Sequence, residues 1–216
     1  MERKQFEVTL ERNPRISIKV IPGHFTNSNA HISHYLDVSG LKSNALIARE
    51  AARELAAPYL TDVPIDTIVC MENTKVIGAY LAEELSQHGF ISGGGEIYVI
   101  TPMSNINGKL TFYDSETEWI RGKNILLLVA TVSSGRTVRG ALECLEYYGG
   151  KLAGISALFL ASGDRPNQKF HALFTSEDVP GYQVCNISVC EMCKAGRPLD
   201  AIVSSEGYTK ISKLEG

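Results

Sequence analysis

The amino-acid sequence predicts an α/β protein with a central parallel sheet flanked by helices. Short apolar segments are followed directly by amphipathic helical patterns: Thr67–Met71 precedes Val76–His88, and Ile125–Val129 precedes Thr137–Tyr148. Strand and helix alternating in this order favour parallel strands, because a crossover helix returns the chain to the same edge of the sheet. The expected strands are Thr67–Met71, Glu96–Ile100, Ile125–Val129 and Leu152–Leu160.

The flanking segments have a different pattern and suggest a division of the chain. Residues 1–40 alternate weakly in polarity and are expected to form a small antiparallel lobe, while residues 41–180 form the core. Asn44–Leu60 is expected to be a helix that covers the sheet. Thr101–Gly122 is long for a passive connection, so we expect a lid or a disordered loop there. Residues 181–216 form a cysteine-containing segment that packs on the core or on the lobe.

Composition narrows the functional classes. The chain has 216 residues, 44% of them hydrophobic, which is enough to build a sizeable core and argues against disorder. A net charge of −3 gives no broad basic surface, so nucleic acid is not an expected partner. There is no secretory h-region and no apolar run long enough to cross a bilayer, so we expect a soluble cytoplasmic protein without a membrane partner.

The strongest functional signal lies where the strand at Ile125–Val129 leads into a helix. Five residues occupy the turn and the start of the helix, namely Ser133, Ser134, Gly135, Arg136 and Thr137. The first N–H groups of a helix have no intrahelical partner and lie at the positive end of its dipole, so this loop is suited to bind phosphate. The alternative is that Ser133 or Ser134 only caps the helix.

This segment resembles the phosphoribosyl pyrophosphate (PRPP) motif of the type I phosphoribosyltransferases. That motif has four apolar residues, two acidic residues, a short variable stretch and Thr-Gly-x-Thr. The resemblance implies that Ser133–Thr137 binds the ribose 5-phosphate. The acidic positions fall on Val129 and Ala130, which cannot accept hydrogen bonds from the ribose hydroxyls. Charged hydrogen bonds of that kind contribute about 1.5–3 kcal/mol each, so ribose binding is expected to be weakened.

Three further segments resemble orotate phosphoribosyltransferases. Ser33–Asp37 is similar to the segment where their N-terminal hood meets the core, and Cys70–Ala79 occupies the place of their pyrophosphate loop. Cys190–Leu199 is similar to a late Cys-x-x-Cys-x-x-Gly-x-Pro-Leu element. The resemblance therefore implies a type I phosphoribosyltransferase fold with a small N-terminal hood, and a homodimer. The candidate pyrophosphate-loop residues are Glu72, Asn73, Thr74 and Lys75.

The sequence does not have all the basic residues expected around a leaving pyrophosphate. Lys75 is the best candidate cation, because it lies beside a helix N-terminus, while Lys109 and Arg121 stand in a loop of mixed charge. Glu72 either replaces the missing acidic pair, by holding ribose or Mg²⁺ through water, or is an ordinary exposed or capping glutamate. Two histidines, His31 and His34, are candidates for binding an acidic ligand or are structural residues.

Cys185, Cys190 and Cys193 form a Cys-x4-Cys-x2-Cys pattern. A tetrahedral zinc site needs four ligands, so the fourth has to come from Cys70, Cys144 or a histidine. The competing interpretation is three reduced thiols that pack a C-terminal turn, and we favour it over zinc.

Two functions from different classes follow. The first is an orotate-type phosphoribosyltransferase that transfers the phosphoribosyl group from PRPP to a nucleobase in nucleotide biosynthesis or salvage. The second is a non-catalytic sensor or regulator that binds PRPP or a nucleoside monophosphate and has lost the acidic pair at Val129 and Ala130. A dinucleotide-binding oxidoreductase is disfavoured, because no Gly-x-Gly-x-x-Gly follows a strand.

Overall fold

The centre of the molecule is a five-stranded sheet in which all neighbouring strands are parallel. The computed structural model describes residues 4–27, 30–61, 64–88, 95–104, 109–161, 170–205 and 207–211. The strand order is β10-β9-β8-β4-β5. The bounds are β4 Thr67–Cys70, β5 Tyr98–Ile100, β8 Asn124–Val132, β9 Lys151–Leu160 and β10 Phe170–Thr175. The predicted central parallel sheet is confirmed, and β10 adds an edge strand that the sequence pattern did not indicate.

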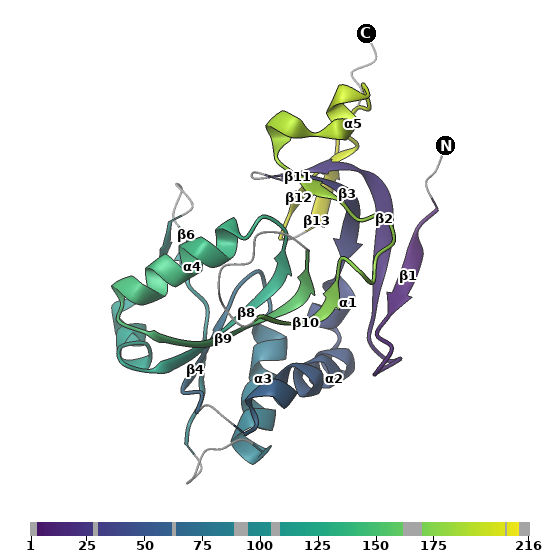
Figure 1. The fold of residues 1–216 in the computed structure, drawn as a ribbon. Coiled ribbons are helices and arrows are strands. Elements are labelled where there is room, and N and C mark those ends of the chain that lie inside the picture. Colours follow the sequence, from purple (N-terminus) through teal and green to yellow (C-terminus); the bar gives the residue numbers. More distant parts are fainter. Residues whose placement is uncertain are drawn as a thin grey trace.

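Helices cover both faces of this sheet (Figure 1). The helices α2 (Ala45–Ala56) and α3 (Lys75–His88) lie on one face, and α4 (Arg136–Tyr147) lies on the other. Alternate residues of β8 serve the two layers: Leu126 and Leu128 belong to the cluster that includes α2 and α3, while Leu127 belongs to the cluster that includes α4. A strand buried on both faces has to be apolar throughout, which is the pattern of β8 in the sequence.

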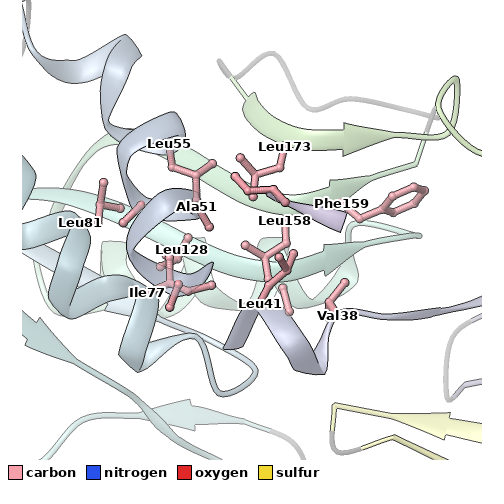
Figure 2. Packing of buried hydrophobic residues seen from close by; sticks show 14 of the residues in the cluster. Val38, Leu41, Ala51, Leu55, Ile77, Leu81, Leu128, Leu158, Phe159 and Leu173 are labelled. Atoms are coloured by element: carbon pink, nitrogen blue, oxygen red, sulfur yellow. The ribbon is translucent and has the colours of Figure 1, made fainter. Parts of the chain in front are cut away.

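Figure 2 shows the larger of the two apolar layers. Leu55 of α2 and Leu81 of α3 lie between the two helices and the sheet, and both are almost fully buried. Leu128 and Leu158 meet them from neighbouring strands. The short helix α1 (Ser39–Ser43) contributes Leu41 to the same layer, so the chain leaving the N-terminal sheet is fixed to the core.

The helix predicted over Asn44–Leu60 is divided in two. Asn44 is the N-cap of α2, and its side-chain oxygen accepts hydrogen bonds from the backbone N–H groups of Leu46 and Ile47. The α-helix ends at Ala56, and a 3₁₀ helix over Ala57–Tyr59 follows. This 3₁₀ helix contains a proline, which cannot donate the backbone hydrogen bond that a continuing helix needs.

A second sheet forms the hood and is built from both ends of the chain. Its order is β11-β3-β2-β12-β13, and β1 pairs with β2 outside that path. The N-terminal strands pair antiparallel, but β12 pairs parallel with β2. The bounds are β1 Phe6–Thr9, β2 Ser17–Thr26, β3 His31–Asp37, β11 Val184–Cys185, β12 Ala201–Ser204 and β13 Gly207–Lys210.

Short elements make up the remaining connections. The expected lid segment Thr101–Gly122 contains a hairpin of β6 (Met103–Ser104) and β7 (Leu110–Thr111), then a 3₁₀ helix over Asp114–Trp119. Residues 105–108 of that segment lie outside the described part of the chain. Before β12 the chain forms a 3₁₀ helix over Ile187–Val189 and the one-turn helix α5 (Glu191–Lys194). Among the helices described, none combines the length and apolarity needed to span a bilayer.

The strand order places a switch point between β4 and β8. These neighbouring parallel strands continue into helices on opposite faces, α3 after β4 and α4 after β8. The two connecting loops therefore diverge at the carboxyl edge of the sheet. In open α/β sheets this divergence creates the crevice where ligands bind.

Candidate functional site

A cleft of about 1440 Å³ lies at the carboxyl edge of the sheet, above the switch point. Residues of the loop after β4 and of the loop after β8 line it. The hood supplies part of the opposite wall through residues of β3 and β12, including Tyr35 and Val203. All five residues of Ser133–Thr137 line this cleft.

The N-terminus of α4 opens into the cleft without a side-chain cap. Gly135 is the N-cap residue, and no side chain forms a capping hydrogen bond there. Its φ of 72° is left-handed, a conformation that glycine adopts without a steric penalty. The structure thus disfavours the interpretation of Ser133 or Ser134 as a helix cap. The first N–H groups of α4, together with the nearby hydroxyls, are arranged to bind an anion.

The carboxylate of Glu72 lies across the switch point and binds the end of β8. Its Oε2 accepts hydrogen bonds from the backbone N–H groups of Ala130 and Thr131, both at 3.0 Å. Burial raises the pKa of Glu72, and the two N–H donors and the positive charge of Lys42 offset only part of that effect. Glu72 is therefore neither an exposed glutamate nor a cap of its own helix.

Two consecutive residues of the pyrophosphate-loop candidate have left-handed backbones. Glu72 has φ 54° and Asn73 has φ 62°, and both line the cleft. Non-glycine residues adopt this conformation at a steric cost, and such strain is concentrated at functional sites. The Glu72 side chain reaches β8 from this loop, and α3 begins at Lys75.

Thr74 and Lys75 are placed differently from Glu72 and Asn73. Thr74 is fully buried, and its single hydroxyl proton is directed to the carbonyl oxygen of Met71 at 2.8 Å, with the Leu128 carbonyl oxygen of β8 at 3.3 Å as a second, weaker acceptor. Lys75 is the first residue of α3 and is exposed, but it is not among the residues that line the cleft. The structure therefore does not place the expected cation Lys75 in the site.

Lys42 of α1 lines the cleft and is a positively charged residue there, where Lys75 had been expected. Its Nζ donates to the carbonyl oxygens of Glu72 (3.2 Å) and Ser205 (3.1 Å), which joins the loop after β4 to the hairpin of β12 and β13. Lys109 and Arg136 also line the cleft, whereas Arg121 does not. Sequence analysis missed Lys42; the available signal was its position shortly after Ser33–Asp37, the segment that resembles the hood junction of the orotate enzymes.

Val129 and Ala130 are both buried, but they face different layers. Val129 is 1% exposed and packs in the layer of α4, while Ala130 is 3% exposed and packs in the layer of α2 and α3. Only Ala130 also borders the cleft. Among the described residues that line the cleft, the carboxylates are those of Glu72 and Glu143.

The candidate histidines and the three cysteines of the Cys-x4-Cys-x2-Cys pattern do not line the cleft. His34 hydrogen-bonds Ser33 and stacks on Tyr182, and burial followed by the charge of Arg197 lowers its pKa. His31 lies beside Cys190 and Cys193, together with His24. Neither His31 nor His34 is among the cleft-lining residues, and neither is Cys185, Cys190 or Cys193. The other two thiols are remote from that group: Cys70 ends β4, and Cys144 lies on α4.

Comparisons with known proteins identify the fold. No protein-family model matches the sequence, and no curated protein matches it significantly. A solved structure of Leishmania donovani UMP synthase matches with a TM-score of 0.56 and 19% identity over 82% of this chain. Adenine phosphoribosyltransferase from Giardia lamblia, in complex with 9-deazaadenine, matches with a TM-score of 0.52 and 18% identity over 73% of this chain. The chain has the type I phosphoribosyltransferase fold.

The extent of these matches differs between the two neighbours. The matched region is 36% of the UMP synthase chain but 93% of the Giardia phosphoribosyltransferase chain. At these identities the type I phosphoribosyltransferase fold is shared, and the activity has to be argued from the site. Within this fold, the Ser133–Thr137 loop and the loop that contains Glu72 flank the switch point of the sheet.

Proposed function

We propose that this chain binds a 5-phosphoribosyl ligand in the cleft and transfers the phosphoribosyl group from PRPP to a nucleobase. The observation that carries the proposal is the uncapped N-terminus of α4, which opens into the cleft at the switch point with Gly135 in a left-handed conformation. This arrangement supports phosphate binding through backbone N–H groups and the hydroxyls of Ser133, Ser134 and Thr137.

The remaining cleft residues support a second substrate and a leaving pyrophosphate. Lys42, Lys109 and Arg136 supply positive charge, and Glu72 supplies a carboxylate near the end of β8. In this proposal Glu72 replaces the acidic pair, either directly at the ribose or through Mg²⁺, which prefers oxygen ligands. A homodimer belongs to the same proposal, and light scattering tests it. The nucleobase is proposed to be orotate.

A specific observation favours a second candidate, a non-catalytic sensor. The apolar side chains of Val129 and Ala130 are buried, so β8 presents no carboxylate to a ribose. Glu72 already accepts two backbone hydrogen bonds, which reduces its capacity to hold ribose hydroxyls. A protein with this site would hold PRPP or a nucleoside monophosphate mainly through the phosphate.

Calorimetry with PRPP and with nucleoside monophosphates, each with and without Mg²⁺, tests ligand binding. Ser134→Asp places a negative charge at the exposed entrance of the α4 loop and is expected to abolish binding. Ser104→Asp is the matched control, because Ser104 is an exposed cleft residue on β6. Equal weakening by both variants would contradict a phosphate site at α4.

Pyrophosphate release with orotate and with a panel of other bases separates the two candidates. Turnover that depends on Mg²⁺ supports the transferase and shows that Glu72 or another group substitutes for the acidic pair. Phosphate-dependent binding without turnover on any base supports the sensor. Absence of both binding and turnover would overturn both candidates.

A further inference from the structure

Four side chains with metal-binding atoms meet where the C-terminal segment crosses the hood sheet. His24 comes from β2, His31 from β3, and Cys190 and Cys193 from the start and the body of α5. Each residue offers one nitrogen or sulfur atom, and these four atoms all lie within 4.8 Å of one another. Figure 1 shows α5 at the end of the hood away from the central sheet, so this group is separate from the proposed phosphoribosyl site.

Four of the six distances within the group are close to those of a tetrahedral zinc site, and the other two are within 4.8 Å. Zn–N bonds of about 2.0–2.1 Å and Zn–S bonds of about 2.3 Å, at tetrahedral angles, separate two nitrogens by about 3.4 Å and a nitrogen from a sulfur by about 3.6 Å. His24 Nε2 and His31 Nδ1 are 3.1 Å apart. Cys190 Sγ lies 3.5 Å from His24 Nε2, and Cys193 Sγ lies 3.7 Å from His24 Nε2 and 3.4 Å from His31 Nδ1.

The hydrogen bonding of His24 prepares one nitrogen as a ligand. Its Nδ1 lies 2.8 Å from the carbonyl oxygen of Arg197, which can only accept, so Nδ1 carries the proton. With the proton on Nδ1, Nε2 is the nitrogen that faces His31, Cys190 and Cys193 and is available as a metal ligand. Metal-binding histidines commonly donate their second N–H to a carbonyl in this way, which fixes both the tautomer and the ring orientation.

Burial distinguishes a structural site from a catalytic one. His24 is fully buried, and His31 and Cys190 are nearly so, whereas Cys193 is exposed. Four protein ligands complete the tetrahedron, so no position remains for a water or substrate molecule. Two thiolates and two imidazoles are a donor set suited to zinc, while hard cations such as Mg²⁺ prefer oxygen.

We propose that His24, His31, Cys190 and Cys193 bind one zinc ion in a closed, structural site. This ligand set includes two of the three cysteines of the Cys-x4-Cys-x2-Cys pattern and takes its other ligands from the N-terminal strands. The third cysteine, Cys185, pairs with His31 in the β11–β3 ladder, and its Sγ lies 3.7 Å from the His31 carbonyl oxygen. It is not one of the four ligands in this proposal.

The ion would add a cross-link between the N-terminal and C-terminal parts of the hood, which are already joined by the β2–β12 and β11–β3 pairings. The helix α5 has four residues and no side-chain cap, so it has little stability of its own. Beside it, the backbone N–H of Asp200 donates to the His24 carbonyl oxygen at 2.7 Å, and the N–H of His24 donates to Asp200 Oδ2 at 2.6 Å. Zinc bound at this point stabilises the folded hood, because the unfolded chain has no preformed site.

Two arrangements of the same residues compete with zinc. In the first, the four side chains form a hydrogen-bonded network that retains a proton between His24 and His31. In the second, Cys185 replaces Cys193 as the ligand, since Cys185 also lies close to Cys190. Metal content distinguishes both from the proposal. The hydrogen-bonded network binds no ion, and the alternative ligand set loses its ion when Cys185 is replaced but keeps it when Cys193 is replaced.

Elemental analysis of the full chain, purified without an affinity tag under reducing conditions, tests the site. We expect about one zinc per chain in the wild-type protein and in Cys185→Ser, and loss of stoichiometric zinc in Cys193→Ser. Cys193 is exposed, so serine leaves no buried cavity, and loss of metal in a folded variant is attributable to the missing ligand. A chelator is expected to lower the Tm of the wild type but not that of Cys193→Ser.

Cobalt gives a second readout that does not depend on any variant. Co²⁺ added to the metal-free wild-type chain is expected to give the absorption of a tetrahedral, thiolate-bound ion. A reduced wild-type chain that contains no zinc and gives no such absorption would overturn the proposal. Zinc retained by Cys193→Ser but lost from Cys185→Ser would also overturn it, in favour of the alternative ligand set. Neither result depends on phosphoribosyl binding, so this test of the metal site is independent of the test of the proposed function.

Discussion

Glu72 and Ala130 connect the ends of two neighbouring core strands, because the Glu72 carboxylate accepts the Ala130 backbone N–H at 3.0 Å. Near this end β8 itself carries the apolar residues Val129 and Ala130. The carboxylate comes from the loop after the neighbouring strand β4, in which Glu72 and Asn73 both have left-handed backbones. The carboxyl end of β8 is thus bound by an acidic side chain from a neighbouring loop, while β8 has no acidic residue of its own.

The burial of Glu72 predicts a pH-dependent contribution to stability. Its pKa is raised above the ordinary value of 4.5, mainly by burial. The folded state therefore binds the proton more tightly, and the associated stability is fully present below pH 4.5 and lost as pH rises through the folded pKa. Each pH unit between the two pKa values corresponds to about 1.4 kcal/mol.

Glu72→Gln tests this contribution, since the amide oxygen can still accept the N–H groups without carrying charge. We expect the wild type to lose stability relative to Glu72→Gln as pH rises above 4.5, with the difference levelling off above the folded pKa. Urea unfolding of both proteins across this range measures it. A wild-type advantage that grows with pH would show that the charged hydrogen bonds outweigh burial.

Restoring the acidic pair one position at a time is expected to give two different results. Ala130 borders the cleft, so Ala130→Asp can direct its carboxylate toward solvent or Mg²⁺ and is expected to strengthen Mg²⁺-dependent PRPP binding. Val129 packs in the layer of α4 and does not border the cleft. Val129→Glu therefore buries an unpaired carboxylate and is expected to destabilise the protein by several kcal/mol.

Calorimetry with PRPP and thermal unfolding of both variants make this comparison. Val129→Leu serves as the packing control, because it adds volume without charge. Equal stability of Val129→Glu and Val129→Leu would contradict the burial argument. Unchanged PRPP affinity in Ala130→Asp would show that the missing carboxylate at this position does not limit ribose binding.

Opposite effects are predicted for substitutions of two glycines of α4: Gly135, its left-handed N-cap, and Gly140, which lies within the helix. A Cβ at Gly135 or at Gly140 meets no heavy atom within 4 Å, so neither substitution creates a clash. Gly135→Ala is expected to cost about 1–2 kcal/mol, because alanine is strained at φ 72°. Gly140→Ala is expected to stabilise the helix by up to about 1 kcal/mol.

Chemical denaturation of the two alanine variants checks this pair. The comparison isolates backbone conformation, since both positions lie at the same helix and both border the cleft. Stabilisation by Gly135→Ala would mean that the loop adopts a different conformation in solution from the one described.

Sequence reasoning located the main elements because they depend on local pattern. The apolar run of β8 and the helix spacing of α3 and α4 are visible in single segments, and the Ser133–Thr137 turn follows from its place between them. The composition of the hood could not be predicted, because the partners of β2 and β12 are set by contacts remote in sequence. Lys42 and His24 were missed for the same reason: their roles depend on residues more than 100 positions away.

Gly78 illustrates how a residue type in a helix can be decided by packing. A Cβ added there would clash with Cys70 Sγ and lie 3.1 Å from Val99 Cγ1, so α3 approaches the sheet closely at this point. Alanine is favoured over glycine in a helix by about 1 kcal/mol, but overpacking of a core costs about 1–3 kcal/mol. Gly78→Ala is therefore expected to be destabilising.

A double-mutant cycle with Cys70→Ala measures this contact, because removing the sulfur makes room for the new methyl group. We expect Gly78→Ala to be less destabilising in the Cys70→Ala background than in the wild type, as judged from unfolding in urea. Additive effects of the two substitutions would mean that the clash is relieved by movement of the helix and not by the thiol.

The parallel pairing of β2 with β12 also sets an order of assembly during synthesis. The register places Phe25 beside Ala201, so every strand of the central sheet leaves the ribosome between these two partners. Closing so long a loop costs entropy and is slow compared with local pairing. A nascent chain can complete its core while β2 still presents an open edge, a state in which strands are prone to pair with other chains. The outer wall of the cleft is consequently the last part to form, so a newly made molecule is expected to acquire its ligand-binding shape only after the C-terminal hairpin has docked.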